Sequence, residues 1–218
     1  MVPSTPSTAD VYNSGPVRRL LDLAIGVQES RGALSLDDEL RRYIRAIRAS
    51  WIARTHCEPY TAAALLDLVA QTLDVPGAAE RTPEGFRERM ARAAGDMDWA
   101  QYLRMLAGLV RILDREPPAF YDELPLGGWE SHVTFPHLGD LPDLLFDDQL
   151  PGATFAEALT AYVTQEHPFC DEHLAPVAAE AQHALVLFPG KQSYGGWTRA
   201  GLLELLATIN DHMAAEHA

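Results

Sequence analysis

The chain has 218 residues and a formal net charge of −14 at pH 7, from 17 Lys and Arg and 31 Asp and Glu. A protein this acidic is repelled by phosphate backbones and anionic lipid surfaces, so nucleic acid and membranes are poor partners, whereas a basic protein, a cationic ligand or a metal ion is favoured. No apolar stretch approaches the roughly 20 residues of a membrane-spanning helix, and the first residues lack a signal-peptide pattern. We therefore expect a cytoplasmic protein, in which the two cysteines stay reduced.

The first half of the sequence predicts helices that begin at polar caps. Residues 1–16 are rich in Ser, Thr and Pro and predict a flexible N-terminal arm. From residue 17, apolar residues recur at helical spacing up to a break near Gly32. The further helices expected here cover residues 35–55, 60–73, a short segment after Thr82, and 96–115, with Ser35, Thr82 and Asp96 as N-caps.

The second half begins with a long connection. Residues 116–152 are too rich in Pro and Gly for regular helix, which predicts one long loop, and residues 133–135 have the composition of a short strand. Helices are expected to resume at 154–165, 174–187 and 197–215. We thus predict a mostly α protein in which residues 17–218 form a single all-α domain, a bundle of about seven or eight helices.

The charge is divided unevenly between the two halves. Residues 17–115 form a neutral, Arg-rich half, whereas residues 116–218 form an acidic half that carries the whole net charge and seven of the eight His. This pattern favours a binding protein of the inhibitor or immunity type, which would offer the acidic half to a basic protein partner; simple solubility is the alternative. The residues expected at that partner surface are Trp129, Glu130, Phe135, Asp140, Asp143, Asp147 and Asp148.

Four arginines gather on one face of the helix expected at 35–55. Arg41, Arg45 and Arg48 lie at helical spacing with Arg42 beside them, opposite an apolar stripe. Such a face is normally solvated and paired with nearby carboxylates. The other interpretation is an internal contact, in which this face receives part of the acidic half.

The densest candidate for a metal site lies between residues 166 and 183. Imidazole, thiolate and carboxylate groups are the usual protein ligands of zinc and iron, and a Glu-x-x-His pair on a bundle helix is typical of di-iron proteins. His167, Cys170 and His173 could converge from one turn as ligands of the same ion. The alternative interpretation is a polar loop at the start of a helix, in which Cys170 is buried as a small apolar residue. We take His167, His173, Glu180 and His183 as candidate ligands, with Glu157, Glu166, Glu204, Asp211 and His212 as candidates for the remaining positions.

These ligands would suit a metal-dependent oxidase or hydrolase, with a divalent zinc or iron ion and with His137 or Lys191 at the substrate. His132 and His137 accompany Trp129 and Phe135 in the long loop, which is either a docking surface or a segment whose aromatic residues anchor it to the core. A helical small-molecule binder with a pocket between helices is the third hypothesis. Cys57, expected at a helix C-terminus, is a poor nucleophile. Whether the protein is an enzyme stays open.

Overall fold

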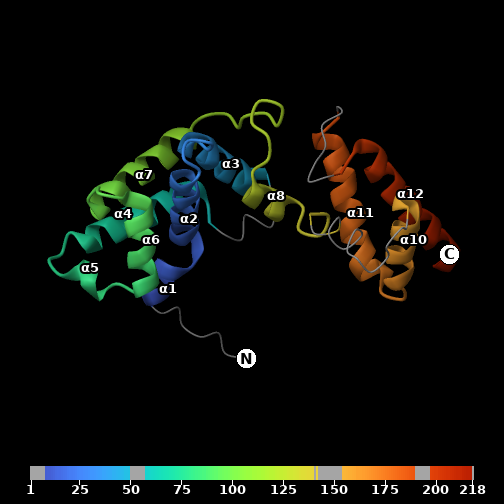
Figure 1. The fold of residues 1–218 in the computed structure, drawn as a ribbon, viewed down its shortest axis with the longest axis horizontal. Helices are drawn as coiled ribbons and strands as arrows, with labels where there is room; N and C mark the ends of the chain where they lie inside the picture. Colours follow the sequence, from blue (N-terminus) through green and yellow to red (C-terminus); the bar gives the residue numbers. More distant parts are fainter. Residues whose placement is uncertain (1–7, 50–56, 140, 142–153, 190–196, 218) are drawn as a thin grey trace. The chain divides into compact units, whose positions relative to one another are not determined.

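The computed structural model describes residues 8–49, 57–139, 141, 154–189 and 197–217, and Figure 1 traces them. Every secondary-structure element within these residues is a helix, which confirms the mostly α class. There are more helices than the seven or eight expected, because several are too short to show a periodic stripe. The helices are α1 (Thr8–Asn13), α2 (Gly15–Glu29), α3 (Leu36–Ala49), α4 (Pro59–Leu73), α5 (Ala78–Arg81), α6 (Glu84–Ala94), α7 (Trp99–Leu113), α8 (Gly128–Thr134), α10 (Phe155–Gln165), α11 (Cys170–Leu187) and α12 (Arg199–Glu216).

Two short helices occupy segments expected to be irregular. Helix α1 forms within the predicted N-terminal arm, and α8 forms within the predicted loop. The strand expected at residues 133–135 is therefore wrong: Val133 and Thr134 lie in the last turn of α8, and Phe135 directly follows the helix. A strand there would have no partner for its backbone groups, whereas a helix satisfies them within the segment.

The observed caps differ in part from the expected ones. Asp98 caps α7 by accepting a hydrogen bond from the Gln101 N–H at 2.9 Å, so the cap predicted at Asp96 is two residues too early. The Thr82 hydroxyl donates back to the Ala79 carbonyl at 2.6 Å instead of capping α6. Before α7 the chain offers two aspartates, Asp96 and Asp98, and sequence alone does not choose between them.

The contacts divide the chain into two compact units, Met1–Glu130 and Ser131–Ala218. In the first, α4 and α7 lie side by side, and α2 packs on α3 and α6 (Figure 1). Apolar side chains that recur at helical spacing meet there and are fully excluded from water. Examples of this core are Leu20, Leu40, Ile47, Leu66, Phe86, Leu103 and Val110.

The second unit is built on α10, α11 and α12, of which α12 packs against both α10 and α11 (Figure 1). Residues that follow α8 complete it: Phe135 and Leu138 are fully buried, and the Trp197 indole N–H donates to the Leu138 carbonyl at 3.0 Å. The segment is thus anchored by its apolar residues, while His132 and His137 stay exposed. This confirms the interpretation in which Phe135 anchors the predicted loop.

The arginine face of α3 receives the chain that follows α7. Arg41 pairs with Glu116 at 2.5 Å, and the Arg42 guanidinium donates to the Pro125 carbonyl at 2.7 Å. Arg45 pairs with Glu130. The internal contact is therefore confirmed, and it explains why the first unit extends to residue 130, beyond the charge boundary at residue 115.

No described helix combines the length and the apolar character that crossing a bilayer requires.

Candidate metal centre

Four potential metal ligands meet in the second unit: His167, Cys170, His212 and His217. Each offers one donor atom, and the four donor atoms all lie within 4.8 Å of one another. The Cys170 sulfur is 3.3 Å from His212 Nε2 and 3.9 Å from His167 Nδ1. Around a tetrahedral zinc ion, such donors lie about 3.3–3.8 Å apart, so the cluster needs shifts of only about 1 Å to hold one.

The turn between α10 and α11 supplies two of these ligands. Helix α10 ends at Gln165, and Pro168 restricts the backbone of the turn that follows. His167 lies in that turn, and Cys170 is the first residue of α11. Cys170 is fully buried while His167 is exposed, so the sulfur forms the inner side of the cluster.

The end of α12 supplies the other two ligands. Residues five apart on a continuous helix point about 140° away from each other, so His212 and His217 could not meet on one face. His217, however, is the C-cap of α12, with a non-helical φ of −128° and its N–H bonded to the Met213 carbonyl. The helix ends at the position where the second imidazole turns towards the first, and the two ring centroids are 5.9 Å apart.

The ring contacts show that the three imidazoles surround one point. The His167 ring lies 5.8 Å from that of His212 and 5.2 Å from that of His217, measured between centroids. His167 and His217 are exposed and His212 is half-buried, so an ion can enter from solvent. Neutral imidazoles and a thiolate around one point form a donor set that suits zinc.

Of the four ligands predicted from sequence, the structure brings only His167 into this cluster. His173, in the first turn of α11, instead has its Nδ1 atom in hydrogen-bond contact with the carboxylate of Glu166, the C-cap of α10. Glu180 is bound to the residues after α8: its Oε2 accepts the N–H groups of His137 and Leu138 at 3.0 and 2.8 Å. His183 is exposed and packs against the Phe135 ring at 5.6 Å, so the Glu-x-x-His pair has a structural role here.

The remaining ligand candidates divide in the same way. His212 is in the cluster, whereas Glu157 serves the capping box of α10. Glu204 and Asp211 are exposed on α12. His217 was missed, although the spacing His-x2-Cys with His-x4-His matches the paired spacings of small zinc sites and could have identified it.

The residues expected at a partner surface differ in how exposed they are to solvent, and several lie outside the described part of the chain. Glu130 is buried in its ion pair with Arg45, and Phe135 is buried in the core of the second unit. Neither side chain can therefore contact a partner protein. Trp129 is half-buried and stacks on Tyr43 with ring centroids 5.4 Å apart. Asp140, Asp143, Asp147 and Asp148, and also Lys191, lie outside the described residues.

Cys57 directly precedes Glu58, the N-cap of α4, so it lies at the start of a helix and not at the C-terminus expected from sequence. Burial raises the pKa of its thiol, and the charge of neighbouring Glu58 raises it further. A thiol with a raised pKa is mostly protonated near pH 7 and reacts slowly. The sequence-based rejection of this residue is consistent with its surroundings.

No family model matches the chain, and the searches of curated proteins and of solved structures found no similar protein. What the protein does is therefore inferred from its own residues.

Proposed function

We propose that this is a zinc-binding protein in which the ion joins the α10–α11 turn to the end of α12. The observation that supports the proposal most strongly is the convergence of His167, Cys170, His212 and His217 from two separate segments. The two ligands of the α10–α11 turn are at least 42 residues away in sequence from the two ligands of α12. They come together only in the folded unit, so a bound ion would stabilise the folded state relative to the unfolded one.

A site with four protein donors favours a structural role for the ion. Zinc prefers four ligands, and catalytic zinc sites keep one position for water or substrate. Here three imidazoles and the Cys170 sulfur would supply all four ligands. The metal-dependent oxidase or hydrolase considered from sequence is thus less well supported than a metal-stabilised fold.

The test is metal stoichiometry on protein purified without a histidine tag. Inductively coupled plasma mass spectrometry should find about one zinc ion per chain in the wild type. His212→Ala and His217→Ala should each lower zinc affinity at least tenfold, since each removes one of four ligands. His173→Ala and His183→Ala are matched controls that remove an imidazole from α11 and should leave the zinc content unchanged.

Each outcome has a clear meaning. Zinc that is lost from the α12 variants and retained in the α11 variants supports the site. Zinc lost instead from His173→Ala or His183→Ala would restore the ligand set predicted from sequence. No uptake after dialysis against zinc would overturn the proposal.

A second candidate function is the binding of a basic protein through the second unit. In the first unit many carboxylates pair with Arg, as in Arg41–Glu116 and Arg48–Asp114. The second unit has 12 Asp and Glu but only Lys191 and Arg199 as cations. Four of its exposed carboxylates form no ion pair with the described residues: Asp171, Glu172, Glu204 and Asp211.

The test compares two sets of charge-neutralised full-length variants with a polylysine peptide as the probe. Neutralising the four exposed carboxylates of the second unit to Asn or Gln should weaken binding and flatten its salt dependence. The matched control removes the same charge from the first unit, where other carboxylates are also exposed. Equal weakening by both sets would show that only net charge matters, and would overturn a surface on the second unit. The control substitutions are Glu80→Gln, Glu84→Gln, Glu88→Gln and Asp96→Asn.

A further inference from the structure

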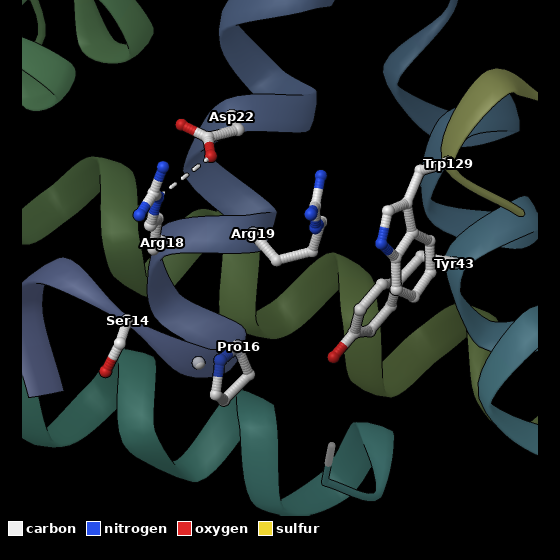
Figure 2. Close-up of a pocket in the computed structure, with 8 residues that line it drawn as sticks. Ser14, Pro16, Arg18, Arg19, Asp22, Tyr43 and Trp129 are labelled. Atoms are coloured by element: carbon white, nitrogen blue, oxygen red, sulfur yellow. Dashed lines mark ion pairs between the residues drawn. The ribbon is translucent and has the colours of Figure 1, made fainter. Parts of the chain in front are cut away.

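The first unit contains a cavity of about 330 Å³ at the beginning of α2, far in sequence from the metal cluster. Its walls come from three helices: the first turns of α2, the middle of α3 and the start of α8 (Figure 2). The volume exceeds that of a few water molecules and suits a small ligand. The lining residues are Ser14, Gly15, Pro16, Arg18, Arg19, Asp22, Tyr43 and Trp129.

Arg19 brings to this cavity a guanidinium group that forms no ion pair with the described residues. Figure 2 shows its side chain extending from α2 towards Trp129, and the guanidinium carbon lies 5.1 Å from the centre of the Trp129 ring. Burial lowers the pKa of Arg19, and no described residue forms an ion pair with it. A guanidinium that contacts an aromatic ring through its face still has its N–H donors at the edge, where an oxyanion can accept two of them.

Tyr43 brings a buried hydroxyl group that has no hydrogen-bond partner among the described residues. Its side chain is 2% exposed, and its oxygen makes no hydrogen bond with the described residues. In Figure 2 this oxygen points from α3 towards the first residues of α2. A buried hydroxyl of this kind is uncommon because it loses its bonds to water without replacing them, so it suggests a missing partner.

The start of α2 adds further positive potential. Helix α2 has 15 residues, and Ser14, Gly15 and Pro16 at its start line the cavity, so the positive end of the helix dipole lies at this site. Arg18 also lines the cavity but is paired with Asp22 at 3.4 Å. Asp22 also pairs with Arg89 at 3.3 Å, so two ion pairs share its single negative charge, which opposes only part of the effect of burial on Arg19.

We propose that this cavity binds a small molecule through a phosphate or carboxylate group, held between the Arg19 guanidinium and the Tyr43 hydroxyl. The oxyanion accepts hydrogen bonds from both groups and so completes the bonding of each. The rings of Tyr43 and Trp129, stacked 5.4 Å apart, form the apolar wall against which the rest of the ligand lies. The proposal concerns the first unit and is independent of the metal cluster.

Binding of three probes to the full chain tests this site. Inorganic phosphate, phenyl phosphate and acetate are titrated by isothermal calorimetry at constant ionic strength. Phenyl phosphate should bind most tightly, because it offers both an oxyanion and a ring. Arg19→Gln should weaken its binding at least tenfold and Tyr43→Phe about tenfold, as expected for hydrogen bonds to a charged group. Arg87→Gln, on α6 and outside the cavity, is the control and should bind as the wild type does.

The outcomes distinguish the ligand class and the site. Binding of acetate but not of the phosphates, with the same dependence on Arg19 and Tyr43, supports a carboxylate ligand. Saturable binding that both variants leave unchanged overturns the site, and so does the absence of binding by all three probes. If Arg19→Gln fails to fold, the indole resonance of Trp129 in the wild type gives a second readout: it must shift on titration.

Discussion

Arg45 and Glu130 form a bidentate ion pair that is almost completely excluded from water. The Arg45 Nε and Nη2 atoms donate to the two oxygens of Glu130 at 2.6 and 2.8 Å, and the side chains are 4% and 1% exposed. Arg45 also donates to the Ala119 carbonyl and lies over the Tyr121 ring. Burial raises the pKa of Glu130, while the bonds and charge of Arg45 oppose that shift. This pair attaches the segment after α7 to α3.

Breaking this pair from one side should be costly. Glu130→Gln leaves the Arg45 charge buried without compensation, which we expect to lower the free energy of unfolding by about 3–5 kcal/mol. Urea denaturation measures the change. Arg92→Gln is the matched control, because it breaks the exposed Arg92–Glu29 pair and should cost less than about 1 kcal/mol. Equal effects of the two substitutions would contradict the buried geometry.

The Tyr43 hydroxyl should destabilise the protein when no ligand is bound. Tyr43→Phe keeps the ring that stacks on Trp129 and removes an oxygen that has no hydrogen-bond partner among the described residues. We therefore expect the free energy of unfolding to rise by about 1 kcal/mol in a buffer without phosphate or carboxylate. A clear loss of stability in urea denaturation would instead show that the hydroxyl has a protein partner.

The helices that the sequence predicted well are those with a long apolar stripe. Helix α7 is one, since Leu103, Leu106 and Val110 recur at helical spacing and are all fully buried. Helix α8 could not be predicted in this way, because seven residues cover only two turns and its partners lie far away in sequence. One of those partners is Arg45. The arginine face of α3 predicted an internal contact, but the sequence could not show which carboxylate would pair with Arg45.

The metal cluster shows the same limit. His167 and Cys170 lie in one turn, so their proximity followed from sequence. For His217 the only signal was its spacing from His212, and on a continuous helix these two imidazoles would point apart. Their contact depends on α12 ending at Glu216, a boundary that propensities do not fix. Glu180 had a plausible spacing for a ligand, yet its carboxylate is occupied by the backbone of His137 and Leu138, a contact across more than 40 residues.

The capping box of α10 should make stability depend on pH. The Thr154 N–H and hydroxyl donate to Glu157 at 2.7 and 2.8 Å, and these bonds lower the pKa of Glu157 below its usual 4.5. A carboxyl whose pKa is lower in the folded state stabilises the fold above the unfolded pKa, and that contribution is lost as the pH falls through the folded pKa.

Glu157→Gln should therefore melt at a lower temperature than the wild type at pH 7, with the difference closing below about pH 4. Thermal unfolding followed by circular dichroism across this range measures the effect. Glu204→Gln removes a charge from an exposed position of α12 and should show no such convergence. A melting difference that stays constant from pH 7 to pH 3 would show that the charge of Glu157 is not responsible.

Removal of zinc should destabilise the protein only while the cluster is intact. An ion that binds the folded state alone stabilises it by about 2.7 kcal/mol when its free concentration is 100 times Kd. A chelator should thus lower the melting temperature of the wild type, whereas Cys170→Ala and His217→Ala should melt alike with and without it. His183→Ala keeps all four donors and should respond as the wild type does. Because the thiol and imidazoles must lose their protons to bind, the effect of the chelator should shrink as the pH falls. A wild-type melting temperature that the chelator does not change would show that the ion contributes nothing to the fold.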